Sequence, residues 1–191
     1  MEPIERRAFL ECRIEAAGSS KLRGYAIVFN AQSQNLGGFR EIIAPEAIDR
    51  TLKEAIDVRA LVDHDSAKIL GRYTAGTLQM QKDGKGLRVT VEPDPDISYA
   101  RDIMLAVKRG DVSGMSFAFR TVEDDWNYDD EEMPIRTVVD MRVSEVSVVT
   151  FPAYTQTDVQ TAHRSMQDFA AQHRRGMSID MARKLHQTRL V

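Results

Sequence analysis

The chain has 191 residues, of which 42% are apolar and 29% are charged, and its formal net charge is −3. This length and composition predict one soluble globular domain with an appendage. The single cysteine, Cys12, excludes an intramolecular disulfide framework and a cysteine-based zinc cluster. No apolar run is long enough for a membrane span or a signal peptide, so we expect neither a transmembrane nor a Sec-secreted protein.

Short strands separated by turn residues dominate the chain as far as Thr150. Helical spacing interrupts them at residues 45–56 and 98–109, where Gly110 ends the second helix. Seven of the ten residues 123–132 are acidic, which predicts a solvated hairpin loop. Most connections are too short for crossovers, so we expect a mainly β fold with flanking helices: a bent, mostly antiparallel barrel of seven to eight strands. The expected strands are residues 7–14, 22–29, 57–62, 77–81, 87–91, 114–120 and 135–150.

A change of character near residue 155 divides the chain into two parts. Apolar residues from Val159 to Ala170 keep helical spacing, and a second short amphipathic segment follows Gly176. Residues 160–191 carry six Arg or Lys against two Asp, about +4, which leaves about −7 for the rest of the chain. We therefore predict a β-barrel domain of residues 1–154 and a basic helical C-terminal tail of residues 155–191.

Three side chains of the β region are candidates for hydrolytic chemistry. His64 is the one histidine of this region and follows an apolar run at a strand end, where a surface turn residue is the commoner interpretation. Ser116 faces away from Phe117 and Phe119 in GMSFAF, which leaves room for an imidazole beside it, although an ordinary strand serine is the commoner interpretation. Glu145 shares a strand face with Ser147, and its partner is either a nearby Arg or Lys or the N–H of an imidazole.

A metal site at Asp63-His64-Asp65 is the third chemical alternative. No second histidine stands at ligand spacing, so we do not expect a bound metal. The sequence also has neither a Walker A loop nor a GxGxxG motif, and we expect no cofactor.

Several motifs in order make the sequence recognisable. They are LRGYAIVFN, REIIAPEAIDRTL, ALVDHDSAKILGR, DGKGLRVTVEPD, VKRGDVSGMSFAF and MRVSEVSVVTFPAY, which together span residues 22–154. With these motifs the chain resembles the tailed-phage prohead proteases, the capsid maturation proteases related to herpesvirus assemblin. The resemblance implies a serine endopeptidase on a bent barrel, with His64 as base, Ser116 as nucleophile and Glu145 as the acid that orients the base.

The resemblance also implies where such an enzyme acts. Its substrates would be segments of scaffold and capsid protein, and the chain itself, inside the prohead in the host cytoplasm. Its partners would be the major capsid protein with its scaffold segment and a further copy of the chain, with no membrane and no specific nucleic acid. Backbone N–H groups of Ala153 or Tyr154 are candidate oxyanion donors, since Pro152 has none. The rival hypothesis is a catalytically silent scaffold or assembly protein on the same fold.

Overall fold

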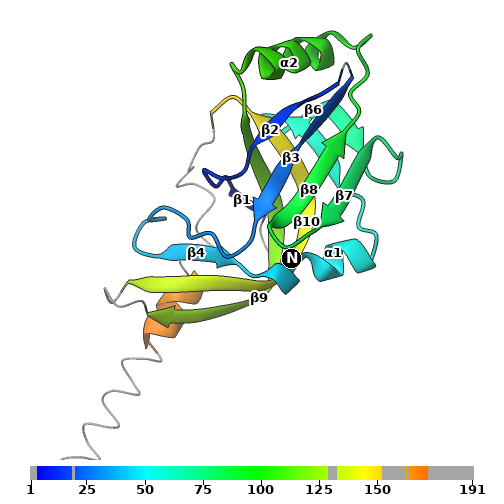
Figure 1. Cartoon of the computed structure of the whole chain (residues 1–191). Coiled ribbons are helices and arrows are strands. Elements are labelled where there is room, and N and C mark those ends of the chain that lie inside the picture. Colours follow the sequence, from blue (N-terminus) through cyan, green and yellow to red (C-terminus); the bar gives the residue numbers. More distant parts are fainter. Residues whose placement is uncertain (1–3, 19, 129–132, 152–161, 163, 172–191) are drawn as a thin grey trace, which may run out of the picture.

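The computed structural model describes residues 4–18, 20–128, 133–151, 162 and 164–171 (Figure 1). The described strands are β1 (Glu5–Arg7), β2 (Ile14–Ala17), β3 (Lys21–Val28), β4 (Arg40–Ile43), β5 (Arg59–Val62), β6 (Asp65–Arg72), β7 (Leu78–Lys82), β8 (Gly86–Val91), β9 (Gly114–Tyr128) and β10 (Pro134–Val149). The helices are η1 (Pro45–Ile48), α1 (Asp49–Lys53) and α2 (Ser98–Arg109), and residues 164–171 are helical as well. The described residues therefore contain ten strands, more than the seven or eight expected.

The strands form two curled sheets. One has the order β1-β9-β10-β5-β6, with β4 also paired to β10, and the other has the order β2-β3-β8-β7. Two described pairings are parallel, β10 with β4 and β10 with β5, and the rest are antiparallel. The predicted mainly β, mostly antiparallel and bent architecture is therefore confirmed as a curled half-barrel with one mixed and one antiparallel sheet, and the specific barrel type stays a prediction.

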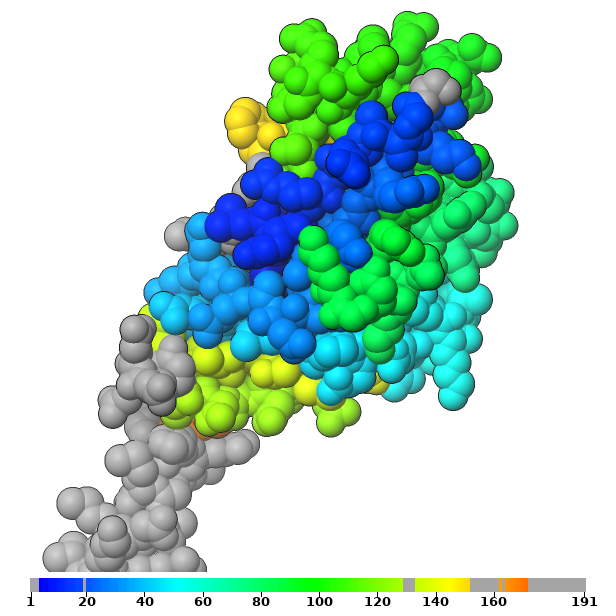
Figure 2. Space-filling model, viewed as in Figure 1, coloured from blue at the N-terminus to red at the C-terminus, as the bar shows by residue number. Residues whose placement is uncertain are grey.

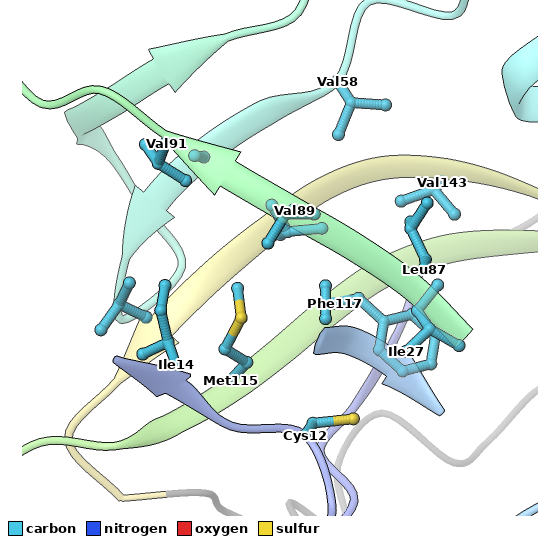
Figure 3. Close-up of a cluster of buried hydrophobic side chains, with 14 of the residues drawn as sticks. Cys12, Ile14, Ile27, Val58, Leu87, Val89, Val91, Met115, Phe117 and Val143 are labelled. Carbon is cyan, nitrogen blue, oxygen red and sulfur yellow. The ribbon is translucent and has the colours of Figure 1, made fainter. Parts of the chain in front are cut away.

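The hydrophobic core lies between the two sheets. Alternate residues of β8, Leu87, Val89 and Val91, point into it and are fully buried, and Met115 and Phe117 of β9 meet them from the other sheet (Figure 3). Figure 2 shows the atoms of β2 and β3 (blue) and of β8 (green) closing over this core. β10 is the middle strand of the larger sheet, so neighbouring strands fix its position on both sides. It is therefore a rigid base for the side chains on the face of the sheet that points away from the core.

The helices follow the sequence pattern in part. Helix α2 ends at Gly110 with a φ of 82°, the left-handed conformation that glycine favours at a helix end. It buries Ala100, Ile103 and Val107. The helix expected at residues 45–56 is shorter, because η1 and α1 end at Lys53 and Ala55 takes a positive φ of 47°. No helix within the described ranges is long and apolar enough to span a bilayer.

Three strand predictions differ from the structure. The strand expected at residues 7–14 is wrong: β1 ends at its first residue, β2 begins at its last, and residues 8–13 between them are irregular. Strands β4 and β6 were not predicted, because neither Arg40–Ile43 nor the charged start of Asp65–Arg72 alternates clearly. The acidic residues 123–128 continue β9 and are not part of a loop.

The C-terminal half of β9 and the N-terminal half of β10 pair with each other and form an arm that extends from the rest of the sheet (Figure 1). The helix of residues 164–171 packs against this arm around Trp126. The indole ring lies 5.3 Å from the Phe39 ring and 6.0 Å from the Phe169 ring, and its Nε1–H donates to Ser165 Oγ at 2.7 Å. A small second core, separate from the main one, therefore joins part of the predicted tail to the β domain.

Candidate active site

His64 lies in a strained two-residue turn that joins β5 to β6. Val62 pairs with Asp65 across this turn, and both Asp63 and His64 have positive φ values, 47° and 60°. Two positive φ angles are those of a type I′ turn, which favours Asn-Gly over the Asp-His found here. Non-glycine residues in this region cost about 1–3 kcal/mol each, and such strain clusters at functional sites.

Contacts with the end of β10 hold the turn in place. The backbone N–H of Asp63 donates to the carbonyl of Val148 at 2.9 Å. The Asp63 carboxylate accepts hydrogen bonds from the backbone N–H and the hydroxyl of Thr150, at 2.8 and 3.0 Å. The imidazole is therefore carried by a turn that is fixed to the central strand of the sheet.

A β-bulge turns Glu145 toward His64. Val143 pairs with Phe119, and Glu145 pairs with Ala118, so Ser144 is an extra residue between them. In a regular strand without a bulge, Glu145 would share the buried face of Val143, since strand side chains alternate with a period of two. The bulge instead places Glu145 on the face of the sheet that lies under the β5–β6 turn.

His64 and Glu145 are in direct contact. Nδ1 of the imidazole lies 2.5 Å from Oε1 of Glu145, and the two side chains are 21% and 12% exposed. A neutral imidazole that donates its Nδ1 proton to a carboxylate has Nε2 free to accept a proton. The structure thus brings together two of the three predicted residues in the arrangement of a general base and its orienting acid.

Ser147 joins both members of this pair. Its hydroxyl donates to Oε2 of Glu145 at 2.6 Å and accepts the backbone N–H of His64 at 3.2 Å. The sequence pattern had placed Ser147 on the face of Glu145, but no role was predicted for it. Period-two alternation is the signal that points to it, and only the tertiary structure shows the two contacts.

Ser116 lies directly across from Ser147 in the β9–β10 ladder. Opposite residues of an antiparallel pair share a face, with their Cβ atoms about 4.5–5.5 Å apart. Ser116 is thus next to the residue that touches both His64 and Glu145. It is 3% exposed, and its hydroxyl donates to the backbone carbonyl of Arg7 in β1 at 2.9 Å. Among the described residues its hydrogen-bond partner is therefore β1, and the third predicted residue is adjacent to the pair without contacting the imidazole.

A buried ion network, which the sequence analysis missed, fixes β1 beside Ser116. Arg7 donates to Glu41 at 2.8 Å and to Glu5 at 2.7 Å, and Arg136 donates to the same two carboxylates at 2.9 and 2.7 Å. Burial alone would raise the pKa of Glu5, but its hydrogen bonds and charge interactions with Arg136 and Arg7 hold that pKa below the usual value. The network therefore positions the carbonyl that accepts the Ser116 proton.

The other candidates of the sequence analysis have separate environments. Asp65 accepts the backbone N–H of Ala67 at 2.9 Å, and this bond lowers the pKa of the Asp65 carboxyl. No group of three His, Cys, Asp or Glu side chains that could hold a metal ion occurs in the described part of the chain. Burial raises the pKa of the Cys12 thiol to about 12, so this cysteine is not a nucleophile at neutral pH. Ala153 and Tyr154, the predicted oxyanion donors, lie outside the described residues.

Comparisons with known proteins show the family of the chain. Residues 9–172 match the family described as caudovirus prohead serine protease. The prohead protease of Enterobacteria phage HK97 is 29% identical over 163 residues, which cover 83% of this chain and 68% of that protein. No solved structure matches the chain significantly. Because the family match covers most of the sequence, the chain belongs to the caudovirus prohead serine protease family, as its motifs had indicated.

Proposed function

We propose that this capsid maturation protease is a serine endopeptidase that uses Ser116 as nucleophile, His64 as general base and Glu145 as the orienting acid. The observation that carries the proposal is the 2.5 Å contact between His64 Nδ1 and Glu145 Oε1, made one strand away from Ser116. The family match supports protease activity, and the geometry supports these three residues as the ones that perform it.

The reaction starts with a change of hydrogen-bond partner. Ser116 gives up the carbonyl of Arg7 and donates to His64 Nε2, for which a rotation about its χ1 is the smallest movement. As Oγ bonds to the scissile carbonyl carbon, His64 takes the hydroxyl proton, and Glu145 stabilises the imidazolium that forms. His64 then protonates the leaving amine, and water hydrolyses the acyl-enzyme by the same proton transfers in reverse.

The negative charge of the tetrahedral intermediate needs hydrogen-bond donors. We assign this role to the backbone N–H of Ala153 or Tyr154, which follow β10 a few residues after Glu145. One such donor contributes roughly 3–4 kcal/mol to transition-state stabilisation. No cofactor or metal enters this mechanism.

The substrates that fit the family are segments of scaffold and capsid protein, and sites within the chain itself. A prohead protease acts on its assembly partners, so we propose the major capsid protein and its scaffold segment as partners, inside the prohead in the host cytoplasm. A homo-oligomer is compatible with this role. The competing hypothesis, a catalytically silent assembly protein on the same fold, requires that no partner is cut.

Co-expression with the capsid protein tests the proposal. Wild type, Ser116→Ala and the control Ser113→Ala are each expressed with it, and the intact mass of every chain is measured. Ser113 is a matched control because it precedes Ser116 by three residues. Its hydroxyl accepts a hydrogen bond from Arg13 at 3.0 Å, away from the His64–Glu145 pair. Cleavage products are expected with wild type and Ser113→Ala and not with Ser116→Ala. Processing by Ser116→Ala at the wild-type rate would refute the nucleophile, and no processing by wild type would favour the silent scaffold.

A further inference from the structure

We propose that Ser147 is a positioning residue for the His64–Glu145 pair, and that its hydroxyl makes the pair competent for proton transfer. The inference rests on the proposed function, because it concerns the efficiency of the same base. It adds a fourth side chain to the predicted set, one that holds the base without touching the substrate.

The hydroxyl of Ser147 connects two different parts of the pair. Its proton goes to Oε2 of Glu145 at 2.6 Å, and its oxygen receives the backbone N–H of His64 at 3.2 Å. The carboxylate is thus held through Oε2 while Oε1 holds the imidazole at 2.5 Å. His64 is fixed at its ring and at its backbone by one closed set of contacts, all anchored on β10.

The turn that carries His64 needs such a restraint. Asp63 and His64 both have positive φ values without being glycine. Thr150 holds the first turn residue through the Asp63 carboxylate, and Ser147 holds the second through its backbone N–H. Ser147 belongs to β10 and Thr150 directly follows it, and β10 is paired on its two sides by β5 and β9.

The hydrogen bonds of Ser147 differ from those of an ordinary strand serine, whose hydroxyl donates only to a nearby backbone carbonyl. The hydroxyl of Ser144, three residues earlier, donates to the backbone carbonyl of Ala118 at 3.0 Å and not to His64 or the Glu145 carboxylate. Ser147 is 1% exposed, and its proton goes to a carboxylate. A hydrogen bond to a charged group is stronger than one between neutral groups, so it fixes the rotamer of both partners.

Loss of this hydroxyl should lower the rate of the chemical step. The carboxylate of Glu145 becomes free to rotate away from the imidazole, and a small misplacement of reacting groups lowers rates by up to about 100-fold. Ser147 does not touch the substrate, so binding should be affected much less than proton transfer. We therefore expect a roughly 10- to 100-fold lower kcat and an almost unchanged KM.

The test uses full-length variants and a peptide that spans a cleavage site mapped by the co-expression experiment. Ser147→Ala removes the hydroxyl. Ser147→Thr and Ser147→Val form a matched pair that differ only in a hydroxyl against a methyl. Ser113→Ala, the control of the co-expression experiment, again controls for the loss of a serine hydroxyl away from the pair. For each variant kcat, KM and the thermal midpoint are measured.

The proposal expects Ser147→Thr to keep most of the wild-type kcat, whereas Ser147→Ala and Ser147→Val lose it while KM stays close to wild type. A wild-type kcat in Ser147→Ala, or equal kcat in the Thr and Val variants, would overturn it. If Ser147→Ala does not fold, the comparison of Thr with Val decides. Activity of Ser116→Ala separates the two hypotheses: an inactive Ser116→Ala beside a fully active Ser147→Ala refutes only the role of Ser147.

Discussion

Replacing Arg136 with methionine should destabilise the fold by an amount that the buried contacts predict. The guanidinium is 1% exposed and donates to Glu5, Glu41, Asp124 and Thr121 at distances from 2.6 to 3.2 Å. Burial alone would lower the pKa of Arg136, and the carboxylates around it raise that pKa above its usual value. The arginine is therefore charged, and its removal leaves carboxylates without their main counterion.

The magnitude follows from the burial of those carboxylates. Glu5 is 1% exposed and Glu41 is fully buried, so water cannot replace the lost guanidinium. Removing one partner of a buried ion pair costs about 3–5 kcal/mol. For a chain of this size such a loss lowers the thermal midpoint by roughly 6–20 °C.

The loss of stability in Arg136→Met should depend on pH in a defined direction. In wild type the pKa of Glu5 is held below its unfolded value, so this carboxylate contributes stability above that value and the contribution is lost as pH falls. In Arg136→Met the effect of burial, which raises the pKa of Glu5, is opposed mainly by Arg7. In the variant, Glu5 then takes up a proton more readily on folding. The difference in the free energy of unfolding between wild type and Arg136→Met should therefore be larger at pH 7 than at pH 5.

Urea unfolding at both pH values measures the free energy of unfolding of wild type, Arg136→Met and the control Arg142→Met. Arg142 lies on the same strand, but its side chain is 53% exposed and its contact with Glu54 is long, 3.4 Å. The control should unfold close to wild type. A loss below about 1 kcal/mol in Arg136→Met at pH 7, or a larger loss at pH 5 than at pH 7, would contradict the reasoning.

Two further predictions concern the base and its acid. The rate of peptide cleavage should rise from about pH 5 to about pH 8, because only a neutral imidazole accepts the serine proton; a rate that is flat over this range would exclude a histidine base. Glu145→Gln should retain measurable activity while His64→Ala retains none, since the amide still contacts the ring but no longer stabilises the imidazolium; equal activities of the two variants in the same assay would contradict the role of Glu145.

The pairing of His64 with Glu145 could be predicted because local pattern and resemblance agree there. The sequence places His64 directly after an apolar strand and Glu145 in an apolar strand where a lone carboxylate needs a partner. The bulge at Ser144 could not be predicted, since a bulge depends on the partner strand and not on the strand alone. The alternation nevertheless assigned Glu145 and Ser147 to one face correctly, because it was counted within the segment after the bulge.

The ion network around β1 was missed for a different reason. Charged residues near a chain end are typical of exposed positions, and nothing local in Glu5 or Arg7 indicates burial. Their partners Glu41 and Arg136 lie 34 residues from Arg7 and 131 residues from Glu5. Such contacts arise only when β1, β4 and β10 have assembled, and the bond from Ser116 to the Arg7 carbonyl arises with them.

The acidic segment shows the same limit of local reasoning. Residues 123–128 have the composition of a loop, yet they continue β9 because each pairs with a residue of β10 between Pro134 and Asp140. Asp124 forms an ion pair with Arg136 at 2.6 Å, and Trp126 packs against the helix of residues 164–171. Tertiary partners thus override the preference of acidic residues for solvent-exposed turns.

The contact between the tail helix and the arm leads to the last prediction. Trp126 is the single tryptophan of the chain, so tryptophan fluorescence reports the surroundings of this one indole ring. A chain that ends at Gln156 lacks the helix, whereas one that ends at Gln172, where the family match also ends, keeps it. The shorter chain should show red-shifted emission and stronger acrylamide quenching, because the indole loses Phe169 and its bond to Ser165.

Both truncated chains should cleave free peptide at close to the wild-type rate. Ser116 and Trp126 are ten positions apart on β9, about 33 Å of extended strand, so the arm lies far from the proposed triad. We expect the tail to bring the enzyme to the assembling shell, so the chain that ends at Gln156 should be depleted when protease copies per purified prohead are counted. Wild-type emission from that chain would refute the docking of the helix on Trp126. Normal incorporation would show that the helix only packs on the arm, and would leave recruitment to another surface of the protease.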